Sequence, residues 1–88
     1  MFLHLGRGVS VRLAEIVYIQ DFAQTDASEE NRRFWARLRR ETPVRDLSAG
    51  RPRSFILTDH GVYLSAISSA TLKKRSDISF AALAASSI

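Results

Sequence analysis

The stretch from Gly50 to Arg75 limits the possible folds of this chain more than any other part of the sequence. Two short apolar segments, residues 54–58 and 62–65, are separated by an Asp-His-Gly tripeptide, which is typical of a hairpin turn with glycine in the left-handed position. An Arg-Pro-Arg step precedes the first segment, and a serine-rich helix start that ends in Lys-Lys-Arg follows the second. We therefore expect a β-hairpin whose rigid strands hold basic groups at fixed spacing, away from the core.

Further short strands are predicted near the N-terminus. Residues 2–5 are apolar, and a Gly-Arg-Gly turn follows them. Residues 9–13 then alternate between apolar and polar, which is the period of a half-buried strand. The β-branched and aromatic run at 16–19 predicts another strand, and a short strand at 44–47 is also compatible with the pattern.

One long helix is predicted between these strands, from about residue 27 to residue 41. Asp26 is a suitable N-cap, and Pro43 makes the preceding residue a natural stop. Phe34, Trp35 and Leu38 share one side of this helix and are expected to face the core. The opposite half carries five arginines, which are Arg32, Arg33, Arg37, Arg39 and Arg40.

These patterns predict an α+β fold with a small, mostly antiparallel β-sheet, one long amphipathic helix and a short C-terminal helix. The short helix is expected to begin at Ser68 or Ser69, to end near Arg75 and to be anchored by Leu72. A length of 88 residues predicts one domain, which we place at residues 1–76, with an apolar tail at 77–88 that either docks or frays. Because a small chain without cysteine has no disulfide to stabilise it, oligomerisation is a plausible source of additional burial.

The positive charge is concentrated in the middle of the chain. The formal net charge is +4, yet residues 32–53 hold eight arginines and two acids, and the remainder carries a net charge of −2. Eleven of the thirteen cations are arginine, whose guanidinium forks onto phosphates. A basic stripe of this kind is expected of a nucleic-acid binder. A solvated basic surface, or a coding bias toward arginine, would explain the composition equally well.

Candidate contacts to double-stranded DNA are the arginines next to turns and strand ends: Arg7, Arg12, Arg51 and Arg53. Arg51 and Arg53 flank Pro52, so an extended backbone would direct both side chains to the same side. They would then place two guanidinium groups along one wall of a groove. The alternative for Arg53 is an ion pair with Asp46 or Asp59 across the hairpin.

No arrangement of residues predicts catalysis or metal binding. His4 and His60 lack a cysteine partner or a nearby acidic cluster at ligand spacing. The serines lack a nucleophile-elbow motif, and the Gly-Arg-Gly turn lacks the third glycine of a dinucleotide fingerprint. We therefore expect no enzyme activity, metal, cofactor or small-molecule substrate. The chain also shows no signal peptide and no run long enough to span a bilayer, so we expect a cytoplasmic protein without a membrane partner.

The start FLHLG, the segment VSVRLAEIVYI and, above all, RPRSFILTDHGVYLSAISSATLKKR resemble the bacterial extracellular matrix regulatory proteins, specifically the RemB type. The resemblance extends from residue 1 to about residue 75, but residues 22–49 match only in character. It implies a small cytoplasmic DNA-binding regulator of biofilm-matrix genes. In the sister type, RemA, it implies a fold similar to the LytTR domain and subunits that form a closed ring, with basic loops around which DNA wraps.

The chain departs from the sister type at two places. That type carries an arginine pair after the glycine of the loop, whereas here Gly50 and Arg51 are followed by Pro52 and then Arg53. Another important arginine of that type lies at the start of the third strand, where this chain has Glu15. Glu15 motivates one alternative function, and the aromatic residues Tyr18, Trp35 and Tyr63 motivate another. One is a protein-interaction scaffold or co-regulator of the same family that does not bind DNA, and the other is an RNA binder that stacks bases on its aromatic rings.

Overall fold

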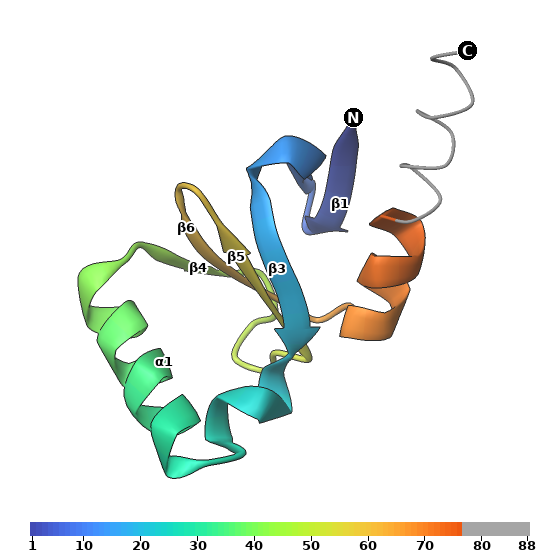
Figure 1. Cartoon of the computed structure of the whole chain (residues 1–88). Helices are drawn as coiled ribbons and strands as arrows, with labels where there is room; N and C mark the ends of the chain where they lie inside the picture. The colour runs from blue at the N-terminus through green and yellow to red at the C-terminus, as the bar shows by residue number, and fades with distance from the viewer. Residues whose placement is uncertain (77–88) are drawn as a thin grey trace.

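The computed structural model describes residues 1–76. Its centre is a four-stranded sheet, and the helices and a two-stranded hairpin lie around this sheet (Figure 1). In chain order the elements are β1 (Phe2–Gly6), β2 (Val9–Arg12), the 3-10 helix η1 (Leu13–Glu15), β3 (Ile16–Asp21), the 3-10 helix η2 (Phe22–Asp26), α1 (Glu29–Glu41), β4 (Val44–Asp46), β5 (Ser54–Thr58) and β6 (Gly61–Ser65). Residues 69–76 form a further helix. The expected apolar tail at 77–88 lies outside the described residues. The α+β class is confirmed.

The sheet is mixed, with strand order β3-β5-β6-β4. Strand β5 pairs antiparallel with both β3 and β6, whereas β4 pairs parallel with β6. The parallel pair arises because α1 lies between β3 and β4 and returns the chain to the end of the sheet where β3 began. The strand patterns alone predicted a mostly antiparallel sheet. They did not indicate the parallel pair, because local sequence patterns contain no information on how α1 connects β3 to β4. Strands β1 and β2 form a separate antiparallel hairpin.

Both faces of the sheet are covered, so the side chains of the inner strand β5 are buried on both sides. The side chains of Phe55 and Ile56 are 1% and 0% exposed. Phe55 belongs to the cluster beneath α1, to which Leu57 also contributes, and Ile56 belongs to the cluster beneath the β1–β2 hairpin. Each fully buried side chain of this size contributes about 1.5–3 kcal/mol to folding. The structure therefore has two cores, one on each face of the sheet.

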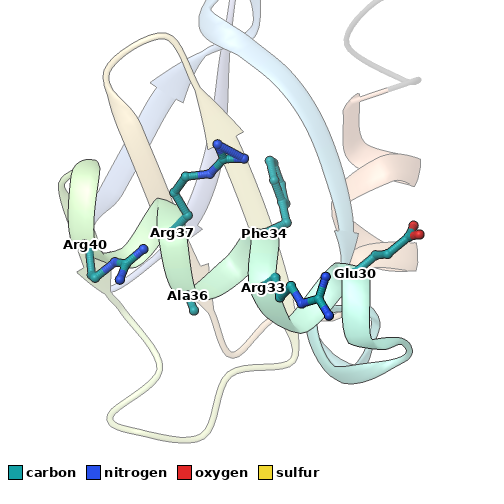
Figure 2. Close-up of a pocket in the computed structure, with 6 residues that line it drawn as sticks. All are labelled: Glu30, Arg33, Phe34, Ala36, Arg37 and Arg40. Atoms are coloured by element: carbon teal, nitrogen blue, oxygen red, sulfur yellow. The ribbon is translucent and has the colours of Figure 1, made fainter.

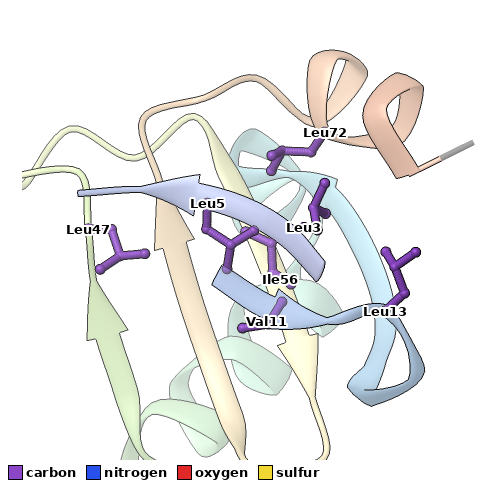
Figure 3. Close-up of a cluster of buried hydrophobic side chains, with 7 residues drawn as sticks. All are labelled: Leu3, Leu5, Val11, Leu13, Leu47, Ile56 and Leu72. Carbon is purple, nitrogen blue, oxygen red and sulfur yellow. The ribbon is translucent and has the colours of Figure 1, made fainter. Parts of the chain in front are cut away.

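The second core joins the hairpin and the helix at 69–76 to the sheet (Figure 3). Leu72 of that helix is 0% exposed, so its predicted role as the anchor of the short helix is confirmed. The Ser65 hydroxyl at the end of β6 donates to the backbone oxygen of Leu5, at 2.6 Å. This bond fixes the hairpin to one end of the sheet.

Helix α1 begins two residues later than the sequence predicted. The N-cap is Ser28, whose hydroxyl accepts from the Asn31 backbone N–H at 3.0 Å, rather than Asp26, which ends η2. Trp35 and Leu38 pack on the sheet as expected. Phe34 does not, since 44% of it remains exposed. Trp35, the next residue along α1, is the aromatic side chain that meets Phe55 of the sheet, with 5.3 Å between ring centroids.

Gly61 has a role that the predicted hairpin turn did not include. The turn residues are Asp59 and His60, and Gly61 is the first residue of β6, where it pairs with Thr58. At φ +138° it lies against the start of β4, so a Cβ atom there would meet the backbone oxygen of Pro43 at 2.5 Å. The glycine is therefore required for close approach of two strands rather than for a left-handed turn.

We expect Gly61→Ala to lower the free energy of unfolding by about 2–5 kcal/mol, because overlap with Pro43 adds to backbone strain. Gly8→Ala is the matched control. Gly8 also has a positive φ of +72°, but a Cβ atom there meets nothing within 4 Å, so we expect a loss of about 1 kcal/mol. Urea denaturation followed by circular dichroism measures both. Equal losses in the two variants would contradict the close-approach explanation.

Candidate nucleic-acid interface

The loop between β4 and β5 is organised by the carboxylate of Asp46. One oxygen of this carboxylate accepts from the Ser48 backbone N–H at 2.8 Å and from the Ser48 hydroxyl. The other oxygen accepts from the Gly50 backbone N–H at 2.9 Å. These bonds form an Asx-type turn, in which a side chain takes the part of a backbone acceptor. The hydrogen bonds from Ser48, and then the Gly50 N–H and the charge of Arg7, lower the pKa of Asp46 below its ordinary value.

A tight turn follows within the same loop. The Arg51 backbone N–H donates to the Ser48 oxygen at 3.2 Å, and both intervening residues have a positive φ, 56° at Ala49 and 82° at Gly50. Positive φ at both central positions is the pattern of a type I′ turn. Arg51, which closes this turn, is exposed.

The backbone of Arg53 connects the loop to β6 and to η2. Its N–H donates to the Ser65 oxygen at 2.8 Å, and its oxygen accepts from the Phe22 N–H at 3.0 Å. The Arg53 side chain is exposed. The predicted alternative, an ion pair with Asp46 or Asp59, does not occur, because no carboxylate of residues 1–76 lies within 4 Å of either Arg51 or Arg53. The carboxylate of Asp46 instead accepts hydrogen bonds from Ser48 and Gly50 of its own loop.

Arg7 lies at the same end of the molecule as this loop. It sits in the turn of the β1–β2 hairpin, where Gly6, Arg7 and Gly8 all have a positive φ. The Ser65–Leu5 hydrogen bond holds the hairpin against the end of β6, and the charge of Arg7 is close enough to Asp46 to lower the pKa of that carboxyl. The structure thus brings three predicted site residues to one end: Arg7, Arg51 and Arg53.

Arg12 lies at the opposite end. It pairs with Phe2 at the far end of the hairpin, directly before η1. Glu15 also lies there. Its backbone oxygen accepts from the Asp59 N–H at 3.0 Å, and its carboxylate lies 3.8 Å from His60 Nε2. Glu15 therefore holds the β5–β6 turn in place. The sequence did not indicate this structural role.

The remaining positive charge is mostly on α1 and β4. Five of the eight arginines at 32–53 belong to α1, and Arg45 belongs to β4. The basic segment that is continuous in the sequence is therefore divided between the loop end and the helix.

No three His, Asp or Glu side chains within residues 1–76 are grouped in a way that could hold a metal ion. In the same part of the chain, the helices are too short or too polar to span a membrane.

Sequence reasoning missed the role of Asp46 in this interface. It treated this residue only as a partner for Arg53. The signal was present, since an Asp two residues before a serine and four before a glycine is typical of a side-chain-capped turn. It also missed the surroundings of Phe34, because that residue was placed in the core.

Comparison with known families supplies independent information. A family model described as RemA-like, extracellular matrix regulatory protein A-like, matches residues 2–75. The match includes the whole of the described sheet, α1 and the loop at residues 47–53, which we call the Asp46 loop. No curated protein gives a significant match to the chain.

The Asp46 loop generates a prediction on pH. Because the pKa of Asp46 is lowered in the folded protein, its stabilising effect is complete above the ordinary value of 3.8 and is lost as the pH falls through the lower, folded value. Asp46→Asn should therefore lower the melting temperature at pH 7, by on the order of 5 °C. The difference in melting temperature between wild type and variant should become smaller as the pH falls below 3.8.

Thermal melting followed by circular dichroism between pH 2 and pH 7 measures this difference. Asp59→Asn is the control, since it removes the same charge from an exposed turn. A difference between wild type and Asp46→Asn that is the same at pH 2 and pH 7 would contradict the role of the Asp46 charge.

Proposed function

Because the chain belongs to the RemA-like family of extracellular matrix regulatory proteins, we propose that it is a transcriptional regulator of matrix genes that binds double-stranded DNA. In this proposal it is of the RemB type, works in the cytoplasm, is not an enzyme and acts as a homo-oligomer, in the form of a ring. Each subunit presents its Asp46 loop to the DNA. The family match establishes the class of protein, and the arrangement of the arginines supports the DNA contact.

The observation that carries this proposal is the loop itself. Arg51 and Arg53 are exposed, and no described carboxylate pairs with them. Their backbone is held in place, because the Arg51 N–H donates to the Ser48 oxygen, the Arg53 N–H donates to the Ser65 oxygen, and the Arg53 oxygen accepts from the Phe22 N–H. A guanidinium on a fixed backbone loses less conformational entropy when it binds a phosphate than one on a mobile loop. Arg7 adds a third cation at this end.

Repetition of the Asp46 loop in an oligomer would make weak phosphate contacts sufficient for DNA binding. A few arginines in one subunit bind DNA weakly, but linked copies add through effective concentration. Each phosphate contact releases counterions, so binding should fall steeply with salt. Since these arginines lie on loops, sequence preference would come mainly from the shape and bendability of the DNA. Arg12, at the other end of the subunit, would contact DNA only if the assembly or a bend in the DNA brings both ends to the duplex.

Exposed apolar side chains support the homo-oligomer. Met1, Phe2 and Val17 are 52%, 65% and 59% exposed, and Val17 lies on β3, an edge strand of the sheet. Met1 lies beside η1, because its backbone oxygen accepts from the Leu13 N–H at 3.1 Å. Exposed apolar groups, one of them on an open strand edge, favour contact with another protein surface.

The same observation favours the second candidate function, a scaffold or co-regulator that does not bind DNA. In that case the exposed apolar residues would contact a different protein, and Glu15 would mark the loss of a DNA contact. The two functions differ in whether the chain binds duplex DNA at low salt.

A mobility-shift titration on duplex DNA at low and high salt tests the DNA contact. We expect Arg51→Ala/Arg53→Ala to weaken binding at least about tenfold, and to make the dependence on salt less steep by about 0.9 per lost phosphate contact. Both side chains are exposed, so the melting temperature should be unchanged.

The control is Arg32→Ala/Arg45→Ala, which removes the same charge from exposed positions outside the loop. It should bind like wild type. Absence of binding by wild type at low salt would favour the scaffold, and wild-type binding by the loop variant would exclude the loop as the DNA contact.

A second experiment addresses the assembly. We expect Phe2→Ser/Val17→Ser to reduce the number of subunits measured by analytical ultracentrifugation, because it removes two exposed apolar contacts without touching a core residue. Phe34→Ser, which changes an exposed aromatic residue on α1, is the control and should keep the wild-type mass. A monomeric wild type, or a double variant of wild-type mass, would contradict this interface.

A further inference from the structure

Phe34 of α1 borders two hollows. The first is a cavity of about 160 Å³ between β3, η2 and α1, lined by Tyr18, Gln20, Gln24, Thr25, Asn31, Phe34, Trp35 and Phe55. The second is an open groove of about 500 Å³ along α1, lined by Glu30, Arg33, Phe34, Ala36, Arg37 and Arg40 (Figure 2). Phe34 is the side chain that lines both hollows, so they adjoin at this residue.

The cavity has the size and walls that suit a flat ring. A cavity of about 150 Å³ is known to hold one benzene molecule. Tyr18 stacks on Phe55 with ring centroids 5.8 Å apart, and Trp35 meets Phe55 edge to face at 5.3 Å. These contacts fix three of the aromatic walls, while Phe34 is left without an aromatic partner among the described residues and remains 44% exposed.

The polar groups of the cavity are amides. The Asn31 side-chain nitrogen donates to the Gln24 backbone oxygen at 2.8 Å, which fixes the amide and leaves its oxygen as an acceptor. Gln20 and Gln24 supply two more amides, each with donors and an acceptor. Side-chain amides match the paired donors and acceptors on the edges of nucleobases. Burial raises the pKa of Tyr18, so its hydroxyl stays protonated as a further donor.

The groove supplies cations beside this cavity. Two ion pairs of α1 join Arg33 to Glu29 at 2.6 Å and Arg32 to Asp26 at 3.5 Å. Within residues 1–76, no carboxylate lies within 4 Å of Arg37 or Arg40. The Arg37 and Phe34 side chains extend from α1 in the same direction, and the Glu30 carboxylate points away from Arg37 (Figure 2). Two arginines one turn apart, without a counter-charge, suit a phosphate group.

We propose that this cleft binds a nucleotide, with its base in the cavity beside Phe34 and its phosphate on Arg37 and Arg40. The order of the groups along α1 supports this assignment, because the aromatic and amide walls end where the unpaired guanidinium groups begin. A ligand with only a phosphate would leave the cavity empty, and one with only an apolar ring would leave the amides and arginines unused. The same chemistry belongs to a free mononucleotide and to one residue of a single-stranded nucleic acid.

The chain contains its own reporter for this site. Trp35 is the only tryptophan and lines the cavity. We would titrate the full chain with the 5′-monophosphates of adenosine, guanosine, cytidine and uridine and follow Trp35 fluorescence, with isothermal calorimetry as a second readout. Adenosine, ribose 5-phosphate and inorganic phosphate separate the contributions of base and phosphate. A short single-stranded RNA distinguishes the free nucleotide from the polymer.

We expect at least one monophosphate to bind saturably and more tightly than its separate parts. Phe34→Ala and Arg37→Ala/Arg40→Ala should each weaken it by about tenfold, the loss expected for one good contact. All three residues are exposed, so the fold should persist. Arg32→Ala, which removes a charge from the same helix outside the groove, should bind like wild type. Arg51→Ala/Arg53→Ala should also bind like wild type, which separates this site from the proposed DNA contact.

Each outcome decides the proposal. Binding of the monophosphates supports a free nucleotide, and binding of the RNA alone supports the same site with a single strand as its source, provided that Phe34→Ala weakens it. Three results overturn the proposal. They are no binding by either class, equal binding of ribose 5-phosphate and the best monophosphate, and unchanged binding in Phe34→Ala.

Discussion

The structure depends on one strand that is buried on both faces. Side chains alternate across a strand, so β5 places Phe55 beneath α1 and Ile56 beneath the β1–β2 hairpin. Without this strand, the cluster beneath α1 would lose Phe55 and the cluster beneath the hairpin would lose Ile56, two of the most deeply buried side chains. A chain of 88 residues buries a modest share of its surface, and it has no disulfide. Using one strand for two cores lets so short a chain close both faces of its sheet.

The direction of the strands then divides the sheet into two ends with different properties. The end with Asp46 and the start of β5 carries the capped loop and three exposed arginines. The other end is closed by Gly61 against Pro43 and by Glu15 against the β5–β6 turn. One end is thus built for close packing and the other for exposure of charge. The proposed regulator would use the exposed end for DNA.

Much of the fold could be predicted, but not how its parts meet. The strands, α1 and the anchor Leu72 were predictable because apolar period and turn residues are local signals. Ser28 could not be distinguished from Asp26 as the N-cap, since both residue types suit the position and the 3-10 helix before α1 decides between them. Phe34 was placed in the core because helical period alone does not show how wide the contact with the sheet is.

The candidate site shows the same division. The sequence by itself determined the number of arginines, the turn residues of the Asp46 loop and the α+β class, because these depend on residue types and on near neighbours along the chain. Only the tertiary structure decided that Arg7 joins this loop while Arg12 lies at the far end, and that Phe34 stands between an amide-lined cavity and unpaired arginines. The reason is physical. These neighbours are far apart along the chain, and their meeting depends on which faces of the sheet the hairpin and α1 cover.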